Sequence, residues 1–177
     1  MRRLNATQLR KGLHQKIDKT SLKKQEIYII LDNVLDTYNI GSIFRLADAV
    51  AAKKIYLCGG TETPPNHRIK KASINTTEWV DWEYKDSAVL AVRDLKDKVK
   101  NIQIVAIEQV AEATLYNKFE YKLPIALIVG HESEGVSKEV LNLCDGVVEI
   151  PMFGVNVSLN VMVSLGIVLY QVIEKSS

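Results

Sequence analysis

The chain has 177 residues and a formal net charge of +2, with 47% hydrophobic and 25% charged residues. This length and balance indicate one globular domain with a sizeable core and exclude a disordered chain. No apolar run approaches the roughly 18 residues of a membrane span, and residues 1–16 contain no apolar signal core. The two cysteines form no C-x-x-C pair, which suits free thiols in a reducing compartment. We therefore expect a soluble, cytoplasmic protein with no membrane partner.

The charge is unevenly distributed along the chain. Residues 1–24 carry eight basic side chains and one acidic side chain, a net +7, which leaves −5 for the remainder of a chain whose total is +2. A basic arm on a mildly acidic body suits contact with a polyanion such as RNA. A solvated basic helix explains the same pattern equally well. We expect two units, a basic arm or helix over 1–24 and a folded domain over 25–177.

Strand-like and helix-like patterns alternate along the folded part of the chain. Strands are expected at 26–32, 54–60, 79–84, 102–108, 125–130 and 146–152, and helices at 39–52, 87–100, 137–144 and 158–175. The stretch 61–73, with Pro64 and Pro65, is expected as a loop, and Ser158 as the N-cap of the last helix. This alternation predicts an α/β domain with a mostly parallel sheet and helices on both faces.

The expected last helix is apolar on two sides. One side carries Leu159, Met162, Val163, Gly166, Ile167 and Tyr170, and the other carries Val161, Leu165, Val168 and Val172. A helix that is apolar nearly all round is buried on both sides. One side can pack on the chain's own sheet, and we expect the other to form a homodimer interface. A helix buried wholly within one chain is the alternative.

The stretch GHESEGVS, residues 130–137, has the glycine spacing of a phosphate-binding loop but lacks its lysine. Val136 stands at the lysine position, and Glu132 and Glu134 would repel a triphosphate. The loop is better suited to a neutral or cationic ligand held by backbone groups, because glycine allows close approach. Its place after the strand 125–130 favours a ligand site, since open α/β sheets bind ligands beyond the carboxyl ends of strands.

Two further stretches carry polar residues in apolar surroundings. Asn39 lies where a helix begins and Arg45 lies six residues on, and an arginine there is costly without an anionic partner. This favours a phosphate-binding or catalytic arginine, although a surface pair with Asp48 explains it equally well. Near the last helix, capping explains Ser158 but does not by itself explain Asn160. The three histidines have no metal-ligand spacing with the cysteines, so no metal site is expected.

Three segments in order resemble the three motifs of the SpoU/TrmH family of SPOUT-class RNA ribose 2′-O-methyltransferases. They are NVLDTYNIGSIFRLADA at 33–49, LIVGHESEGVSKEV at 127–140 and VEIPMFGVNVSLNVMVSLGIVLY at 148–170. The resemblance covers roughly residues 26–172. It implies an α/β domain with a C-terminal trefoil knot, S-adenosylmethionine (SAM) as methyl donor and a homodimer through the knot and the C-terminal helix. It also implies an RNA substrate, for which we favour tRNA over rRNA.

The resemblance carries roles over to residues that match its motifs. It implies cofactor contacts through the main chain of Gly130, Ile150 and Leu159, completed by Ala106, Ile107, Glu132, Met152 and Asn160. It implies a catalytic group made of Arg45, Asn39, Glu132, Ser158 and Asn160. Arg45 would hold the target phosphate and help to remove the 2′-hydroxyl proton. Together with the charge of the arm, this predicts RNA contacts by Arg45, Arg2, Arg3, Arg10 and Lys11.

The sequence also departs from the family pattern. His131 stands where the family more often has asparagine, and Met162 where it often has serine. Both positions adjoin the expected cofactor pocket. Two other classes of function stay open at this point: a catalytically silent RNA-binding relative of the same fold, and a small nucleotide-binding regulator. The silent relative would transfer no methyl group, and the regulator would bind nucleoside triphosphates.

Overall fold

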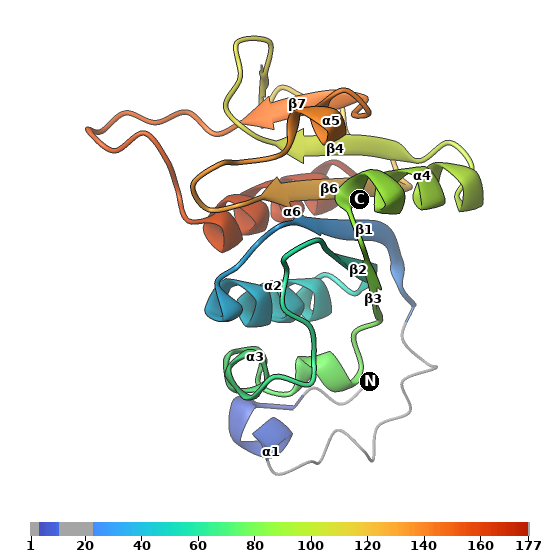
Figure 1. Cartoon of the computed structure of the whole chain (residues 1–177), viewed down its shortest axis with the longest axis vertical. Helices are drawn as coiled ribbons and strands as arrows, with labels where there is room; N and C mark the ends of the chain where they lie inside the picture. Colours follow the sequence, from blue (N-terminus) through green and yellow to red (C-terminus); the bar gives the residue numbers. More distant parts are fainter. Residues whose placement is uncertain (1–3, 11–22, 177) are drawn as a thin grey trace.

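A parallel seven-stranded sheet forms the centre of the molecule (Figure 1). The structure is a computed structural model, and it describes residues 4–10 and 23–176. The strand order is β3-β2-β1-β6-β4-β7-β5, and each pair of neighbouring strands runs parallel. The strands are β1 Gln25–Asp32, β2 Ala52–Cys58, β3 Trp82–Lys85, β4 Gln103–Ile107, β5 Thr114–Leu115, β6 Ile125–Gly130 and β7 Gly146–Glu149.

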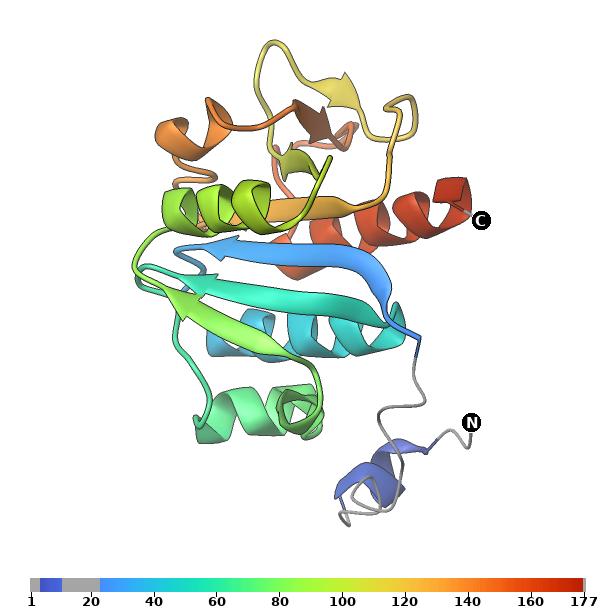
Figure 2. The same cartoon turned by 90° about the vertical axis from the view of Figure 1, so that its right-hand side faces the viewer.

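Helices cover both faces of this sheet. They are α1 Ala6–Arg10, α2 Thr37–Ala49, α3 His67–Ser73, the 3-10 helix η3 Thr76–Glu78, α4 Ala88–Lys98, α5 Lys138–Leu141 and α6 Val161–Ser176. Helices α2, α3 and α6 pack in one core with one side of the central strands, and α4 and α5 pack in a second core on the opposite side (Figure 2). The predicted α/β class, with a mostly parallel sheet and helices on both faces, is confirmed.

The central strands end at one common edge. Asp32, the last residue of β1, pairs with Cys58 of β2 and with Gly130 of β6. Ile107 at the end of β4 pairs in the same way with Val148 of β7. β1 and β6 are buried along almost their whole length, as expected for parallel strands covered on both faces. The loops that follow these strands therefore meet at one place.

The expected loop at 61–73 is wrong in its second half, where α3 forms. The Asn66 side chain caps this helix by accepting from the amides of Arg68 (2.9 Å) and Ile69 (3.2 Å). The helix packs closely on α2 because α2 has a glycine at the contact. A Cβ on Gly41 would lie 2.6 Å from the Cβ of Ala72. Pro64 and Pro65 do lie in an irregular segment, as predicted, and Asn66 directly after them caps the helix.

The last helix begins at Val161, later than the predicted start at 158. Asn160 caps it, because its Oδ1 accepts from the amides of Met162 (3.0 Å) and Val163 (3.4 Å). Ser158 is exposed and is not the cap, so that prediction is wrong. The capping interaction uses the Oδ1 atom of Asn160 and leaves the side-chain nitrogen Nδ2 available for another hydrogen bond.

The two sides of α6 differ in burial. Within the chain, Leu165, Val168, Leu169 and Val172 are buried. On the other side Val163 keeps 39% and Tyr170 54% of its surface exposed, and Met162, Gly166 and Ile167 are only partly covered. One apolar side of the helix therefore packs on the chain's own core, and the second remains open to solvent.

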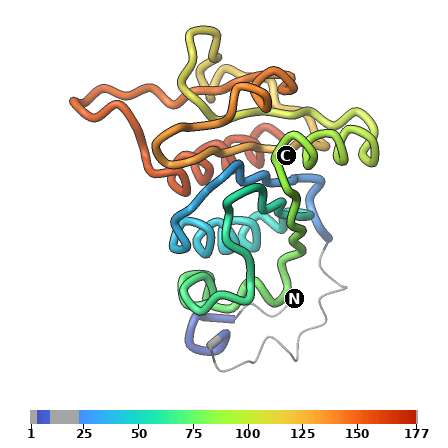
Figure 3. The backbone as a smooth tube through the Cα atoms, in the orientation of Figure 1, coloured from blue at the N-terminus to red at the C-terminus, as the bar shows by residue number. Residues whose placement is uncertain are grey.

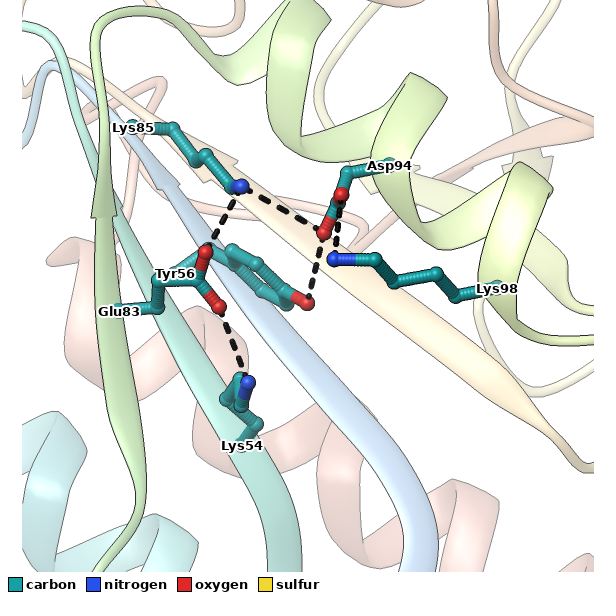
Figure 4. Close-up of polar contacts among 6 residues, drawn as sticks. All are labelled: Lys54, Tyr56, Glu83, Lys85, Asp94 and Lys98. Atoms are coloured by element: carbon teal, nitrogen blue, oxygen red, sulfur yellow. Dashed lines mark hydrogen bonds and ion pairs between the residues drawn. The ribbon is translucent and has the colours of Figure 1, made fainter.

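An ionic cluster holds β3, at one edge of the sheet, against β2 and α4 (Figure 4). Glu83 accepts from Lys85 (2.7 Å) and Lys54 (3.0 Å), while Asp94 contacts Lys98 (2.7 Å) and Lys85 (3.5 Å). The hydrogen bonds from these lysines hold the pKa of both carboxyl groups below their ordinary values. The cluster fixes an outer strand of the sheet through pairs of opposite charges.

The N-terminal helix α1 lies next to the segment that follows α3 (Figure 1), where the Asn75 side chain donates to the carbonyl of Leu9 over 3.4 Å. Among the helices of residues 4–10 and 23–176, none is long and apolar enough to cross a membrane.

Candidate active site

A cavity of about 510 Å³ opens where β4, β6 and β7 end. Its volume lies in the range of small-molecule sites. Three stretches of chain supply its walls: the end of β4, the loop after β6, and the segment from the end of β7 into α6. The lining consists of Ile107, Glu108, Gln109, Val129, Gly130, His131, Glu132, Ser133, Gly135, Val148, Glu149, Ile150, Met152, Asn156, Val157, Ser158, Leu159, Asn160, Val161 and Ser164.

The loop after β6 doubles back onto the end of its own strand. His131 and Gly135 exchange two backbone hydrogen bonds, of 3.0 and 2.9 Å. A Cβ on Gly130 would overlap the backbone of Gly135, so only glycine fits at that position. Gly135 itself has φ +70°, a left-handed conformation that favours glycine. The two glycines of the phosphate-loop spacing thus serve to fold this loop tightly rather than to cradle phosphate.

Side-chain acceptors hold the loop 131–137 in place through hydrogen bonds from its backbone amides. The Nδ1 atom of His131 accepts from the amides of Ser133 (3.0 Å) and Glu134 (3.2 Å). From outside the loop, Glu108 accepts from the amide of Val136 over 2.8 Å. Asp32, which ends β1, accepts from the amide of Ser137 (2.9 Å) and from its hydroxyl (2.7 Å). The carboxylates of Glu108 and Asp32 are charged acceptors, which make strong hydrogen bonds, so one conformation of the loop is strongly favoured.

Glu132 points across to the start of α2. Its carboxylate accepts from the amides of Leu35 (3.2 Å) and Asp36 (3.0 Å) and from the Asn39 side chain (3.0 Å). Asn39, which is buried, accepts in turn from the side chain of Asn160 over 3.0 Å. We call this connection of Glu132, Asn39 and Asn160 the carboxamide bridge. It joins the three segments that the sequence singled out.

The environment of Glu132 favours its charged form. Burial alone would raise the pKa of this carboxyl, but the hydrogen bonds from Asn39, Asp36 and Leu35 together outweigh burial and lower the pKa below its ordinary value. With both oxygens already accepting hydrogen bonds, the group is a weak proton acceptor. Its geometry is that of a residue which holds two loops together.

The charge of the cavity is negative. Glu108, Glu132 and Glu149 belong to the lining, and none of the described residues that line the cavity is a lysine or an arginine. A triphosphate would meet carboxylates with no cation to balance its charge, whereas a positively charged or neutral ligand suits this lining. In the described part of the chain, no three His, Cys, Asp or Glu side chains are grouped so as to hold a metal ion.

The cavity brings together most of the residues that the sequence singled out for the cofactor. Seven of the eight line it: Gly130, Ile150, Leu159, Ile107, Glu132, Met152 and Asn160. Ala106 does not line it and is fully buried in the sheet. Of the predicted catalytic residues, Ser158 also lines the cavity, while Asn39 lies behind it and contacts Glu132 and Asn160.

Arg45 is placed differently from the other predicted catalytic residues. It is exposed on α2, it is absent from the cavity lining, and no ion pair or hydrogen bond of its side chain is present among the described residues. The alternative pair with Asp48 is not formed among the described residues, and Asp48 instead accepts from the indole of Trp79 over 2.7 Å. The predicted RNA contacts Arg2, Arg3 and Lys11 lie outside the described residues, as does the side chain of Arg10.

Sequence reasoning missed several residues of the site. Glu108, Gln109, Glu149 and Asn156 line the cavity without having been singled out, and Asp32 braces its loop. A signal was available for Asp32 and Glu108, because each is an acidic residue at the carboxyl end of a buried strand. Such residues lie at the edge where open α/β sheets form their sites.

A sequence model of the SpoU rRNA methylase family matches residues 26–170 of this chain. The chain belongs to this family. All three wall segments of the cavity and the whole carboxamide bridge lie within the matched range.

Characterised relatives resemble the chain over most of its length. It is 32% identical, over 84% of its residues and 69% of the relative's, to the tRNA (guanosine(18)-2′-O)-methyltransferase of Aquifex aeolicus. It is 30% identical to the 23S rRNA (guanosine-2′-O-)-methyltransferase RlmB of Ralstonia nicotianae, over 85% of its own residues and 59% of the relative's. The chain thus spans only about three fifths of that second relative.

Solved structures of the family share the fold. The A. aeolicus TrmH/SpoU tRNA modifying enzyme superimposes with a TM-score of 0.77 at 29% identity, covering 97% of this chain and 84% of the other. An AdoMet-bound rRNA methyltransferase from Sinorhizobium meliloti superimposes with a TM-score of 0.78 at 28% identity, covering 94% of this chain and 59% of the other. AdoMet is another abbreviation for SAM.

Proposed function

We propose that this chain transfers a methyl group from SAM to a ribose 2′-hydroxyl of structured RNA. The observation that carries the proposal is the cavity at the ends of β4, β6 and β7, which two of the three segments that resemble the family line and which the third joins through Asn39. Among the described residues, this lining carries carboxylates and no lysine or arginine. SAM carries a positively charged sulfonium, so its charge suits this lining. The relatives named above as 2′-O-methyltransferases act on tRNA or rRNA, which supports an RNA substrate.

The main chain of Gly130, Ile150 and Leu159 holds the cofactor in this proposal, with Ile107, Met152 and Asn160 beside it. Bound SAM supplies an electrophilic methyl group. Ala106 contributes indirectly, because it is buried in β4 directly before Ile107. Glycine at 130 lets the loop after β6 fold back onto the end of its strand, because a Cβ there would overlap the backbone of Gly135.

The polar residues divide into two roles in this proposal. Glu132 and Asn39 are positioning residues, since their polar atoms are already engaged within the carboxamide bridge. Arg45 holds the phosphate of the target nucleotide and stabilises the negative charge that develops as the 2′-hydroxyl loses its proton. A guanidinium stays protonated in proteins, so Arg45 contributes charge and is not the proton acceptor. Ser158 presents an exposed hydroxyl beside the cavity.

We also propose that the protein works as a homodimer through α6 and the segment before it. The open apolar side of α6 supports this, as do the exposed Phe153 and Val155. Arg45 lies outside the cavity of its own chain, and α2 packs directly on α6. A dimer formed through α6 therefore brings α2 of one copy close to the other copy, where Arg45 can reach the second cavity.

The trefoil knot remains a prediction of the family resemblance for the C-terminal segment of the chain. A crystal structure with SAM bound would test it together with the dimer. A backbone path that can be drawn straight by pulling its two ends would contradict the knot.

RNA binding by the arm of residues 1–24 is the remaining part of the proposal, with Arg2, Arg3, Arg10 and Lys11 contacting phosphates. We favour tRNA over rRNA as substrate and expect a cytoplasmic location, where both RNAs are accessible. Binding through such an arm should weaken steeply with salt. Unchanged RNA affinity and salt dependence after deletion of residues 1–20 would contradict this role.

The decisive experiment compares Arg45→Ala with Arg93→Ala. Arg93 is a matched control because it is also an exposed helical arginine, on α4 at the opposite face of the sheet. Calorimetry should detect SAM binding and no ATP binding to the wild type. Transfer of tritiated methyl groups to bulk tRNA and rRNA, followed by mapping of ribose methylation, measures activity. We expect Arg45→Ala to abolish transfer with SAM affinity within a few-fold, and Arg93→Ala to change neither.

Each other outcome contradicts a definite part of the proposal. SAM binding without methyl transfer by the wild type would indicate a silent RNA-binding relative. Triphosphate binding would indicate a nucleotide-binding regulator. Equal loss of SAM binding and transfer in Arg45→Ala would show that Arg45 has a structural role.

A further inference from the structure

His131 occupies the position between Gly130 and Glu132 and lines the cavity. Its ring Nδ1 accepts hydrogen bonds from two backbone amides, those of Ser133 (3.0 Å) and Glu134 (3.2 Å). A nitrogen that accepts carries no hydrogen, so the ring is neutral and its hydrogen is on Nε2. The side chain is therefore used as an acceptor of defined tautomer.

The pattern is that of an Asx turn with histidine in the place of asparagine or aspartate. In such turns, a side-chain acceptor on one residue bonds the amide two residues on and thereby replaces a backbone turn. Here the turn lies inside the backbone pair of His131 and Gly135, which closes the loop at its base. In the described part of the chain, the amides of Ser133 and Glu134 have no other hydrogen-bond partner.

The loop that His131 folds carries the residues that face the ligand. Gly130 directly precedes this loop, and Glu132 is its second residue; both line the cavity, and the Glu132 carboxylate accepts from Asn39 of α2. Loss of the Nδ1 acceptor would leave two amides unpaired and allow residues 132–134 to turn toward other partners. The cavity wall would then lose its shape even though the braces at Val136 and Ser137 remain.

We propose that His131 is a positioning residue for the cofactor, which acts by accepting the two amides through an unprotonated Nδ1. This inference rests on the proposed function, because the cofactor is taken to be SAM. It assigns a role to a side chain that the sequence marked only as a departure from the family's more frequent asparagine. Both side chains carry an acceptor atom directly on Cγ, Nδ1 in histidine and Oδ1 in asparagine.

Three substitutions distinguish the contribution of the hydrogen-bond acceptor from that of the size of the ring. His131→Asn keeps an acceptor on Cγ, His131→Gln moves it one bond further out, and His131→Phe keeps the ring and removes the acceptor. The readout is the Kd for SAM, measured by calorimetry on the full chain. We expect His131→Asn to lie within about threefold of the wild type, and His131→Phe and His131→Gln to bind about tenfold to a hundredfold more weakly, as the loss of two hydrogen bonds implies.

The outcomes distinguish this inference from the proposed function. If the wild type binds no SAM, the proposed function fails. If the wild type binds SAM and His131→Phe binds it within threefold, the inference is overturned and the proposed function stands. Weak binding by all three variants would show that an acceptor on Cγ is not sufficient without the imidazole ring, which also overturns the inference.

A measurement on the wild type guards against variants that fail to fold. Nitrogen NMR distinguishes a bare ring nitrogen from one that carries hydrogen. At neutral pH, with SAM bound, the Nδ1 of His131 should give the signal of an unprotonated nitrogen and Nε2 that of a protonated one. The opposite tautomer, or a doubly protonated ring, overturns the inference without any substitution.

Discussion

Two walls of the same cavity are built in opposite ways. The loop 131–137 is braced by acceptors from His131, Glu108 and Asp32 and by its backbone pair with the strand end. The segment 153–159, on the other side, projects from the body of the molecule (Figure 3). Its side chains at Phe153, Val155 and Val157 are 95%, 102% and 72% exposed. A Cβ added at Gly154 would meet nothing within 4 Å.

The difference shows which part of the site one chain completes by itself. Backbone amides and side-chain acceptors specify the first wall, and none of its bonds requires another molecule. The second wall presents large apolar side chains to water, which is costly unless another surface covers them. Under the proposed function, the wall at residues 131–137 belongs to the cofactor, and the segment 153–159 belongs to the dimer interface.

The largest expected effect comes from adding one methyl group to each wall. Gly130→Ala places a Cβ into the backbone of Gly135, whereas Gly154→Ala adds the same atom in open space. Because backbone cannot move aside as a flexible side chain can, we expect Gly130→Ala to weaken SAM binding by at least about 100-fold. Gly154→Ala should stay within about threefold of the wild type. Calorimetry and thermal melting check both variants, and similar effects at the two glycines would contradict the distinction.

The second prediction replaces two exposed apolar side chains of the segment 153–159 by polar ones. The double substitution Phe153→Ser and Val155→Ser should leave the fold intact and weaken dimerisation by about 100-fold or more, as loss of two buried apolar side chains implies. Light scattering over a range of concentrations measures the change. Leu90→Ser is the control, since Leu90 is 44% exposed on α4, on the opposite face of the sheet. A monomeric wild type at micromolar concentration would refute the dimer.

The smallest expected effects come from removing a carboxylate at two positions, one bonded mainly to amides and one paired with lysines. Glu132→Gln replaces an oxygen that accepts from backbone by an amide group that donates, at a cost of about 1–3 kcal/mol in unfolding free energy. Glu83→Gln in the ionic cluster breaks partly exposed ion pairs and should cost less than about 1 kcal/mol. Urea unfolding at low and high salt separates the two, because salt screens the lysine pairs and leaves hydrogen bonds to amides largely unchanged. Equal salt dependence would show that charge, rather than amide bonding, stabilises the braced wall.

The sheet could be predicted because its signal is local. Runs such as 125–130 are apolar and β-branched, and burial on both faces is the environment that such runs require. Helix α3 was missed because prolines before it suggested a loop, although the cap at Asn66 was visible. The start of α6 was misplaced because Ser158 and Asn160 both suit a cap, and only the contact with Asn39 distinguishes them.

The site was harder to predict because its contacts are distant in sequence. Glu108 bonds an amide 28 residues on, and Asp32 bonds one 105 residues on. No periodicity or spacing reports such pairs. The exposure of Arg45 could not be predicted either, because its position on a helix does not show whether the side chain faces the chain's own cavity or solvent.

The carboxamide bridge has a consequence for how the protein is made. Asn39 and Asn160 are 121 residues apart, and the cavity lining extends to Ser164. Since the ribosome releases the chain from its N-terminus onward, the last cavity wall emerges after nearly all the rest of the sheet. A growing chain therefore has no complete place for a methyl donor until residues 160–164 have emerged, and under the proposed function it gains activity only after that point.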